Sequence, residues 1–600
     1  MMRGRCTIVV ALIVAGMHLP LSAQTLRSQY LVNPDLAIGY VDSCARFWFK
    51  AYDSVRGGFS MNIDRTGNLI TSWGTGKNTL NQSRDAYGFL RAYMLTGNAQ
   101  YLTYARRALD FLYRSGWDST NGGWYNEVNR DGVPSNPTAN KTAYYQHYAL
   151  LGIAASVEVT DDSLDRVMLA RSLAHNEARF WDARLQAFGY YDQTLANGTQ
   201  PSGKSFNATV DAVTTHLLSL YLMTGDSVYA RRLRQIGDNM VNRLAASSAS
   251  QAIGFVEGFD SDWNPDPSNT MTIMGHVLKT GWCLARLYVL FQDTSYLGAA
   301  DRLVESVVQK GYDRQNGGPY KDYNRVTGEM LMWGQKDTAK AWWQMEQAIT
   351  AGLLLDYCGH YSYASIPVLQ MADETLEFFM KYFVDHVYGE VYENRTKYGA
   401  QIWDTNKGSS GKAAYHSIEL GYYVYLYGKL LLRKEPATLH YAFSPKPYER
   451  QIRLMPIVGK YMIAGVLLNG ERHFSFDKWP PMLRIPANVG GDFAVTFEPI
   501  VTSVDSRAVA GMPEQLQLEQ NFPNPFNPST TIRFSLPVAG RAIMTVHDIL
   551  GREVARLVDE EKATGTYTVR FSADGLASGV YLYRLQAGGV QMTKRMLYVR

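Results

Sequence analysis

Apolar residues recur at helical spacing through residues 36 to 430 of the chain. In the segment 101–113 they share one face, with Arg106, Arg107 and Asp110 between them, which is the pattern of an amphipathic helix. Three other runs are apolar on more than one face: 217–223, 277–290 and 348–355. The chain is thus predicted to contain outer helices and inner helices, with the inner ones buried by an outer ring.

A Gly-Gly-aromatic signature with a preceding aspartate separates these helices. Its copies begin at Asp53, Asp118, Asp182, a degenerate Gly254-Phe255, Asp313 and Asp385. They are about 65 to 70 residues apart, which leaves room for two helices and a loop with a tight turn. Glycine permits the positive φ that such a turn needs. Six units predict a mostly α fold, an (α/α)6 barrel of six helical hairpins whose loops line one concave face.

Near Pro436 the pattern changes to short alternating runs, which indicate β-strands. Since 600 residues exceed one hydrophobic core, several domains are expected. A small antiparallel β domain and a C-terminal β-sandwich of about seven strands should follow the barrel. The predicted parts are the barrel over 24–435, the small β domain over 436–500, a linker over 501–516 and the sandwich over 517–600.

The first 23 residues are typical of a secretory signal peptide. Arg3 and Arg5 precede an apolar run over 8–15, and Leu21-Ser22-Ala23 fits a cleavage site after Ala23. That run is too short to span a bilayer, and no later segment has about 18 uninterrupted apolar residues, so an exported chain without a membrane span is expected. The net charge of +4 gives no reason to expect a nucleic-acid partner.

Three cysteines remain after the signal peptide, namely Cys44, Cys283 and Cys358. Because they are odd in number, far apart and without a CxxC pair, a disulfide framework is not expected. Cys283 and Cys358 lie in apolar runs typical of buried thiols, whereas a single disulfide of Cys44 stays open in an oxidising compartment.

Three of the eleven histidines stand where an apolar helical run begins: His216, His276 and His416. A side chain at a helix start that faces the barrel mouth is both rigid and accessible to a substrate. Any one of them also fits a hydrogen-bonded core histidine, but three in corresponding places of different repeats favour a shared site. Histidine, with an unperturbed pKa of about 6.5, can act as acid or base near neutral pH.

The last 84 residues carry several specific stretches, 520–528 (QNFPNPFNP), 547–552, 576–581 and the chain end from Lys594 to Arg600. With these stretches, residues 517–600 closely resemble the C-terminal type A sorting domain of type IX secretion cargo. The resemblance implies the type IX secretion machinery as a partner, passage through the outer membrane after Sec-dependent export, and release or surface attachment. The residue pattern alone indicates a terminal β-sandwich that could also bind carbohydrate.

The barrel has its own set of matching stretches, which occur in one order across roughly residues 35 to 430. They are Gln82-Ser83-Arg84, Gly122-Gly123-Trp124-Tyr125, Thr215-His216-Leu217-Leu218, Gly275-His276, Trp342-Trp343-Gln344-Met345-Glu346 and Lys412 with Tyr415-His416. On these residues the barrel resembles the N-acylglucosamine 2-epimerase superfamily, which includes cellobiose and mannose 2-epimerases and aldose-ketose isomerases.

The resemblance implies roles for particular residues. His276 and His416 would form the acid/base pair with His216 assisting, and Arg84 would bind sugar oxygens and a developing enediolate. The further residues expected to bind substrate are Trp342, Glu346, Tyr415, Lys279 and Glu419.

The chemistry is consistent with these residue types. Epimerising or isomerising a reducing sugar removes the proton on C2 of the open chain, so a base of near-neutral pKa and a stabilised oxyanion are needed. A second group across the substrate returns the proton to the other face or to C1. No metal or nicotinamide cofactor is expected, since the sequence has no HExxH, no clustered His/Cys ligand set and no GxGxxG after a strand.

The chain departs from the family beside each histidine. The position three residues after His276, usually Glu, is Lys279, and the position three after His416, usually Arg, is Glu419. Ser219 replaces the Glu common three residues after His216. We expect Lys279 and Glu419 to form a swapped ion pair, which would leave His276 more often neutral and make His416 more readily protonated.

Two other functions remain open on the same barrel. A glycoside hydrolase or lyase would need two suitably spaced carboxylates, for which Asp211, Glu257 and Asp260 are candidates that fit loop or capping residues more simply. A sugar-binding protein that has lost catalysis would also account for the 40 tyrosines and 12 tryptophans. Epimerisation and isomerisation share the removal of the C2 proton, so the sequence favours neither.

Overall fold

The computed structural model describes residues 26–332, 335–359, 366–500, 516–521, 523–563 and 565–599. The expected signal peptide, residues 1–23, lies outside the described residues, as does the expected linker except for its last residue, Leu516. The chain divides into two compact units at the boundary between residues 500 and 501. Each is described by itself.

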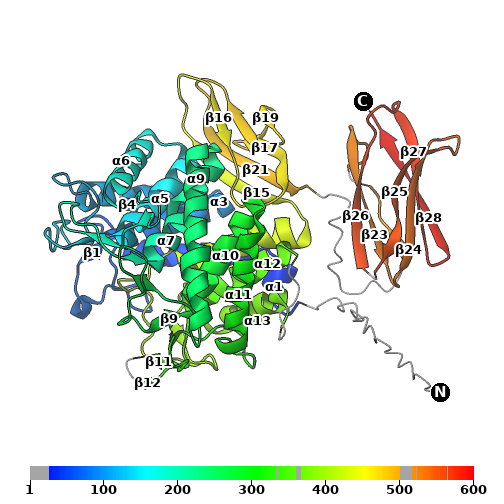
Figure 1. Ribbon diagram of the computed structural model, residues 1–600. Helices are drawn as coiled ribbons and strands as arrows, with labels where there is room; N and C mark the ends of the chain where they lie inside the picture. The colour runs from blue at the N-terminus through cyan, green and yellow to red at the C-terminus, as the bar shows by residue number, and fades with distance from the viewer. Residues whose placement is uncertain are drawn as a thin grey trace, which may run out of the picture. The chain divides into compact units, whose positions relative to one another are not determined.

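Residues 26–500 contain a ring of helical hairpins around a set of inner helices (Figure 1). The inner helices are α3 (Thr79–Thr96), α5 (Ala143–Thr160), α7 (Phe206–Ala212) with its continuation α8 (Leu218–Thr224), α10 (Met274–Phe291), α12 (Trp342–Tyr357) and α14 (His416–Leu426). Their outer partners are α4 (Ala99–Phe111), α6 (Ser163–Arg179), α9 (Ser227–Asn239), α11 (Thr294–Lys310), α13 (Val368–Tyr382) and α2 (Leu36–Trp48). Because α14 packs against α2, the two ends of the helical segment close the ring. The predicted (α/α)6 barrel is confirmed.

Burial explains why the two sets of helices differ in sequence. The inner helix α10 is apolar nearly all round and buries most of its length, whereas the outer helix α9 buries one stripe, with Leu233 and Ile236 inward and arginines outward. Side chains cap the helix starts: Asn78 accepts the backbone N–H of Asn81 at α3. The expectation that the apolar runs 277–290 and 348–355 form inner helices is confirmed.

The Gly-Gly-aromatic signature is a turn that links consecutive repeats. Its aspartate accepts backbone N–H groups of the turn, as Asp118 does from Thr120 and Asn121, and binds a buried lysine. This lysine stands just before the next inner helix, except for Lys407, which is separated from α14 by a loop. Five such pairs are present among the described residues: Lys77–Asp53, Lys141–Asp118, Lys204–Asp182, Lys340–Asp313 and Lys407–Asp385. The degenerate fourth copy has neither partner, and Thr272 packs against Gly254 in its place.

Glycine is required in this turn by geometry. Gly58 has φ +71°, and a Cβ there would lie 2.5 Å from the ring of Phe111. An L side chain would therefore be strained by its backbone and would clash with the outer helix as well. The glycines of the signature thus allow the turn backbone to pack closely against a neighbouring helical hairpin.

Residues 437–499 form seven strands that share one hydrophobic core with the barrel. The sheets have the orders β15-β21-β17-β18 and β16-β20-β19. Their strands are β15 (Ala437–Phe443), β16 (Arg450–Arg453), β17 (Tyr461–Leu468), β18 (Glu471–His473), β19 (Phe476–Asp477), β20 (Met482–Ile485) and β21 (Gly491–Pro499). The expected Asn469-Gly470 turn joins β17 to β18, with positive φ at both residues.

This β region covers the end of the ring where the inner helices stop. Tyr93, near the end of α3, hydrogen-bonds to Asp492, and Asp161, at the end of α5, pairs with Arg450 at 2.9 Å. In Figure 1 strands β15 to β17 lie at one end of the helices, while the loops around β9 (Met271–Ile273) lie at the other end. The loop end of the ring is therefore the one left open to a substrate.

The C-terminal unit is a sandwich of two antiparallel sheets with the orders β22-β23-β26 and β25-β24-β27-β28. Its strands are β22 (Gln517–Leu518), β23 (Ser529–Leu536), β24 (Gly540–His547), β25 (Glu553–Lys562), β26 (Gly565–Ser572), β27 (Gly579–Ala587) and β28 (Val590–Tyr598). Phe534, Met544 and Tyr583 belong to its separate core. The predicted C-terminal β-sandwich is confirmed.

Two further observations concern the described residues as a whole. None of their helices is both long and apolar enough to cross a membrane. Cys44, Cys283 and Cys358 are free thiols, the first two fully buried.

Candidate active site

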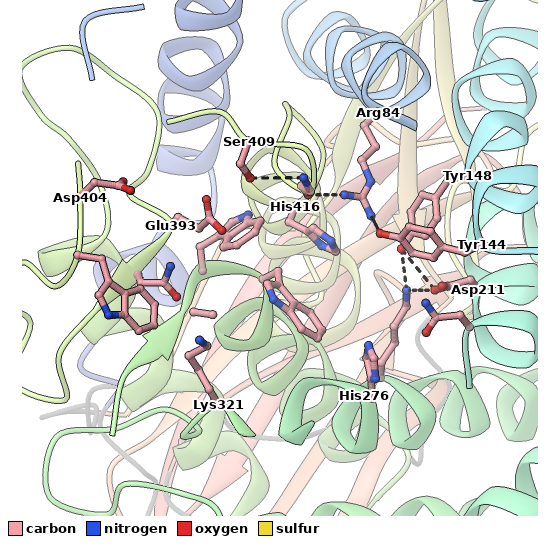
Figure 2. Close-up of a pocket in the computed structure, with 18 of the residues that line it drawn as sticks. Arg84, Tyr144, Tyr148, Asp211, His276, Lys321, Glu393, Asp404, Ser409 and His416 are labelled. Atoms are coloured by element: carbon pink, nitrogen blue, oxygen red, sulfur yellow. Dashed lines mark hydrogen bonds and ion pairs between the residues drawn. The ribbon is translucent and has the colours of Figure 1, made fainter. Parts of the chain in front are cut away.

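A cavity of about 610 Å³ lies at the loop end of the ring, among the starts of the inner helices (Figure 2). Five of the residues predicted from the sequence line it: Arg84, His276, Lys279, Trp342 and His416. They come from four different inner helices, α3, α10, α12 and α14. The ring thus brings together side chains that are far apart in the chain, from Arg84 on α3 to His416 on α14.

His276 is held by a glutamate from a loop. Its Nδ1 lies 2.8 Å from Oε2 of Glu257, whose Oε1 accepts the backbone N–H of Ile273 at 2.9 Å. The ring of Phe206 stacks on the imidazole with centroids 3.7 Å apart. These contacts fix the orientation of the ring, and an accepting carboxylate oxygen favours the tautomer that carries its proton on Nδ1.

His416 is held in a corresponding way by a glutamate from α12. Its Nδ1 lies 2.6 Å from Oε2 of Glu346, and the ring of Tyr415 lies against the imidazole at 4.1 Å between centroids. Burial lowers the pKa of His416 well below its usual value, and the nearby cations Arg84, Lys279 and Lys412 lower it further. The sequence-based expectation that His416 is readily protonated is therefore wrong.

The two histidines border the same tryptophan. The ring of Trp343 lies 5.3 Å from the His276 ring and 6.0 Å from the His416 ring. Glu257 and Glu346 each contact Nδ1 of their histidine. In the described part of the chain no residue hydrogen-bonds to Nε2 of either histidine. Two imidazoles with a locked Nδ1 thus leave their Nε2 atoms available to one cavity.

Arg84 faces the histidines from α3 (Figure 2). Its guanidinium donates to the carbonyl of Gly411 and to the hydroxyl of Tyr144, the latter at 3.2 Å, and stacks over the ring of Tyr148 at 4.1 Å. Only 3% of the residue is exposed. A buried guanidinium in this position is a fixed positive charge for an oxygen anion in the cavity.

Lys279 pairs with Asp211 rather than with Glu419. Its Nζ lies 2.6 Å from Oδ1 of Asp211 on α7 and 3.3 Å from the hydroxyl of Tyr148. Burial alone would lower the pKa of Lys279, but the charge of Asp211, the hydrogen bond with it and the nearby Tyr148 together raise the pKa above its usual value. No ion pair joins Lys279 to Glu419 within the described ranges, so the expected swapped pair is not formed.

Four other predicted residues do not line the cavity. Glu346, Tyr415 and Glu419 are at most 3% exposed and lie behind the lining, so they support other side chains rather than reach a substrate. His216 stacks on His147 at 5.4 Å between rings, buried in the barrel. Its helix begins at Phe206, ten residues earlier, so His216 lies mid-helix and does not correspond to His276 or His416.

The carboxylates considered for hydrolysis are all engaged elsewhere. Glu257 binds His276, Asp211 binds Lys279, and Asp260 accepts from Asn264 in its own exposed loop. A cleaving pair made from these three carboxylates would use groups that already bind other side chains. Two further carboxylates, Glu393 and Asp404, line the cavity.

The roles of several residues around the cavity were not predicted from the sequence. Three of them stand two residues after the aromatic or bridging residue of a signature: Glu257, Lys321 and Glu393. The backbone carbonyl of each accepts the N–H of the first residue of an inner helix. The pairs are Glu257 with Phe206, Lys321 with Met274, and Glu393 with Trp342. This repeated hydrogen bond places a side chain of each of these repeats beside the cavity. A polar residue two positions after the signature was therefore the feature of the sequence that could have identified these residues.

The outer part of the cavity is aromatic. Trp73 and Trp403 line it and are about half exposed, at 51% and 54%, and the amine of Lys321 lies 4.6 Å from the Trp403 ring. Flat, exposed indoles are suited to stacking on sugar rings.

One cluster among the described residues has ligand types and spacing compatible with a metal ion. It consists of Glu346, His416 and Glu419, whose ligand atoms all lie within 4.8 Å of one another. All three side chains are buried, and the cations Lys279, Arg286 and Lys412 face them.

Comparison with known proteins gives two family matches. Residues 57–419 match the family model of N-acylglucosamine 2-epimerase, and residues 520–599 match that of the secretion system C-terminal sorting domain. Cellobiose 2-epimerase of Bacteroides fragilis is 22% identical over 382 residues, which are 62% of this chain and 93% of that protein.

Solved structures give the same picture of the fold. Cellobiose 2-epimerase from Spirochaeta thermophila has a TM-score of 0.57 at 21% identity and covers 68% of this chain and 98% of its own. A D-mannose isomerase has a TM-score of 0.58 at 20% identity and covers 67% of this chain and 99% of its own. The resemblances of the barrel and of the C-terminal domain are thereby confirmed.

Proposed function

Since the chain belongs to the N-acylglucosamine 2-epimerase family and is a carbohydrate epimerase or isomerase, we propose that it moves the C2 proton of a reducing sugar, with His276 and His416 as the acid/base pair. The observation that carries the proposal is that both imidazoles line one cavity with Nδ1 bound to a glutamate and Nε2 free of described partners. Such a pair can remove a proton on one side of a carbon and return one from the other.

The proposed reaction starts from the open-chain sugar. One Nε2 takes the proton from C2 while Arg84 stabilises the negative charge that develops on the substrate oxygens. Reprotonation of C2 from the opposite face gives the epimer, and protonation of C1 gives the ketose. Arg84 and His416 are 3% and 7% exposed, so protein rather than water surrounds most of both side chains.

We infer a mono- or disaccharide as the substrate class. Two similar proteins are named for cellobiose 2-epimerase and D-mannose isomerase activities, and the exposed Trp73 and Trp403 provide stacking surface beyond the histidines. The sorting-domain match over 520–599 supports export by type IX secretion to the cell surface or medium. A signal peptide over residues 1–23 would supply the preceding Sec-dependent step.

The test is proton exchange in D2O. The protein is incubated with cellobiose, mannobiose or mannose, and deuterium at C2 is followed by NMR, with the products separated by chromatography. We expect deuteration at C2 together with an epimer or a ketose. Cleavage of the disaccharide would indicate a hydrolase, and binding without exchange would indicate a protein without catalysis; either result contradicts the proposal.

Variants assign the exchange to the two histidines. His276→Asn and His416→Asn should each abolish C2 exchange, whereas His386→Asn, at an exposed position on the turn after α13, serves as the matched control and should not. Undiminished exchange in both site variants would refute the assignment.

A further inference from the structure

Glu419 lies one helical turn after His416 and next to Glu346, in a place the proposed reaction does not use. The ligand atoms of Glu346, Glu419 and His416 all lie within 4.8 Å of one another. The two glutamates are 1% and 3% exposed. Two buried carboxylates at this distance cannot both remain ionised without a large cost, so the pair retains a proton.

The hydrogen bonds around the pair leave room for one shared proton. The hydroxyl of Tyr87 donates to Oε1 of Glu419 at 2.7 Å, and the amide of Gln347 donates to Oε2 of Glu346 at 3.0 Å. Oε2 of Glu346 also meets Nδ1 of His416. The two carboxyl groups are within hydrogen-bonding reach of each other, and a proton shared between them satisfies both.

The charged groups around the cluster come from every packed element. Arg84 on α3, Lys279 and Arg286 on α10, and Lys412 in the loop before α14 face it, with the hydroxyls of Tyr87 and Tyr415 beside them. Lys279 and Lys412 already have partners in Asp211 and Glu390. A divalent metal ion would be repelled by these cations, whereas a shared proton adds far less charge.

We propose that Glu419 is a positioning residue for His416, sharing one proton with Glu346 so that His416 is backed by a carboxyl pair of single negative charge rather than by two carboxylates. This inference rests on the proposed function for its catalytic meaning. The shared proton weakens the attraction that would hold a second proton on His416. His416 therefore stays neutral in the resting enzyme and ready to accept a proton at Nε2.

The directions of the pKa shifts agree with this arrangement. Burial raises the pKa of Glu346 well above its usual value, and the charge of Glu419 and a hydrogen bond with it raise it further. Burial and the surrounding cations lower the pKa of His416. Both directions describe a cluster whose proton resides on the carboxyl pair.

Glu419→Gln tests the proposal directly. The amide that this substitution introduces can donate to Glu346, so the single negative charge that the carboxyl pair shares in the wild type then lies on Glu346 alone, the carboxylate in contact with Nδ1 of His416. The net charge of the pair is unchanged but lies closer to His416, so the protonation midpoint of His416 should rise, by up to about one pH unit. The midpoint is read by NMR of protein labelled with ¹⁵N-histidine, in which the His416 signals are assigned by their loss in His416→Asn.

Three further variants separate a specific effect from a structural one. Glu419→Asp keeps a carboxyl group and should titrate like the wild type, and Glu419→Met should behave like Glu419→Gln if the latter does not fold. Glu158→Gln removes another buried carboxylate, which pairs with Arg91, and should lower thermal stability without moving the His416 midpoint.

The outcomes are distinct from those of the exchange assay. An unchanged His416 midpoint in both Glu419→Gln and Glu419→Met would overturn the proposal, as would a stoichiometric divalent metal that the wild type holds and Glu419→Gln loses. Because the titration needs no substrate, it gives an answer even for a protein without C2 exchange. Where exchange is present, the acid limb of its pH profile should move to higher pH in Glu419→Gln, since His416 then becomes protonated at higher pH.

Discussion

Replacing Glu257 by glutamine should impair catalysis, although the side chain of Glu257 does not line the cavity and would not contact the substrate. The carboxylate accepts from the backbone N–H of Ile273 at 2.9 Å and lies 2.8 Å from Nδ1 of His276, whereas an amide has one accepting and one donating end. If the oxygen faces His276, the NH2 group opposes the N–H of Ile273. If the NH2 group faces His276, the imidazole must carry its proton on Nε2 and can no longer accept one from C2.

The expected fall in kcat follows from the hydrogen bond between Glu257 and His276 alone. A hydrogen bond to a charged group contributes about 1.5 to 3 kcal/mol, which corresponds to about a 10- to 150-fold fall in kcat. KM should change little, because Glu257 lies behind His276 and does not line the cavity. A loss of this size is comparable to the effect of removing groups that orient metal-bound histidines in other proteins.

The assay is the initial rate of C2 deuteration over a range of sugar concentrations. Glu177→Gln, on the outer helix α6, is the matched control and should retain full activity. Unchanged kcat in Glu257→Gln, or a loss that appears only in KM, would refute the view that Glu257 sets the tautomer of His276.

Three other changes test the site and the ring. Arg84→Lys should lower kcat/KM about 100-fold, because a lysine cannot reproduce the stacked, multiply bonded guanidinium; initial rates measure this. Asp211→Asn leaves Lys279 charged and buried without its partner, so the free energy of unfolding in urea should fall by about 3 to 5 kcal/mol, and adding Lys279→Met should recover most of it. Lys141→Met should lower the free energy of unfolding by a similar amount, because it leaves Asp118 buried without its lysine partner. Thr272→Val, in the repeat without the Lys–Asp pair, should lower it by about 1 kcal/mol.

The ring could be predicted from the sequence because its signal is local. Except in the fourth copy, each turn combines a glycine at a positive φ with an aspartate that accepts from the same turn, as at Asp118 and Gly123. This requirement lies within a few consecutive residues. The buried lysine could not be paired with its aspartate in advance, because the two are about 20 residues apart and meet only when consecutive repeats stack.

The site was predictable where a residue's place on its own helix decides its role. His276 and His416 begin inner helices and therefore reach the cavity. His216 was misplaced because the start of its helix lies at Phe206, after a lysine and serine that parallel the residues before other inner helices. The partners of Lys279 and Glu419 depend on the register between neighbouring helices, which the sequence of one helix does not contain.

The departures at positions 279 and 419 change the surroundings of the histidines without removing what the chemistry needs. Glu257 supplies from the loop the carboxylate that the helix face beside His276 lacks, and Asp211 neutralises Lys279, which stands on that face. On the other side Glu346 binds His416, and the like charge of Glu419 is relieved by the proton proposed above. Each histidine therefore keeps one anionic partner at Nδ1. Glu257 lies in a loop and Glu346 on α12 beside a second carboxyl group. These different surroundings can give the two imidazoles different proton affinities, as an acid and a base need.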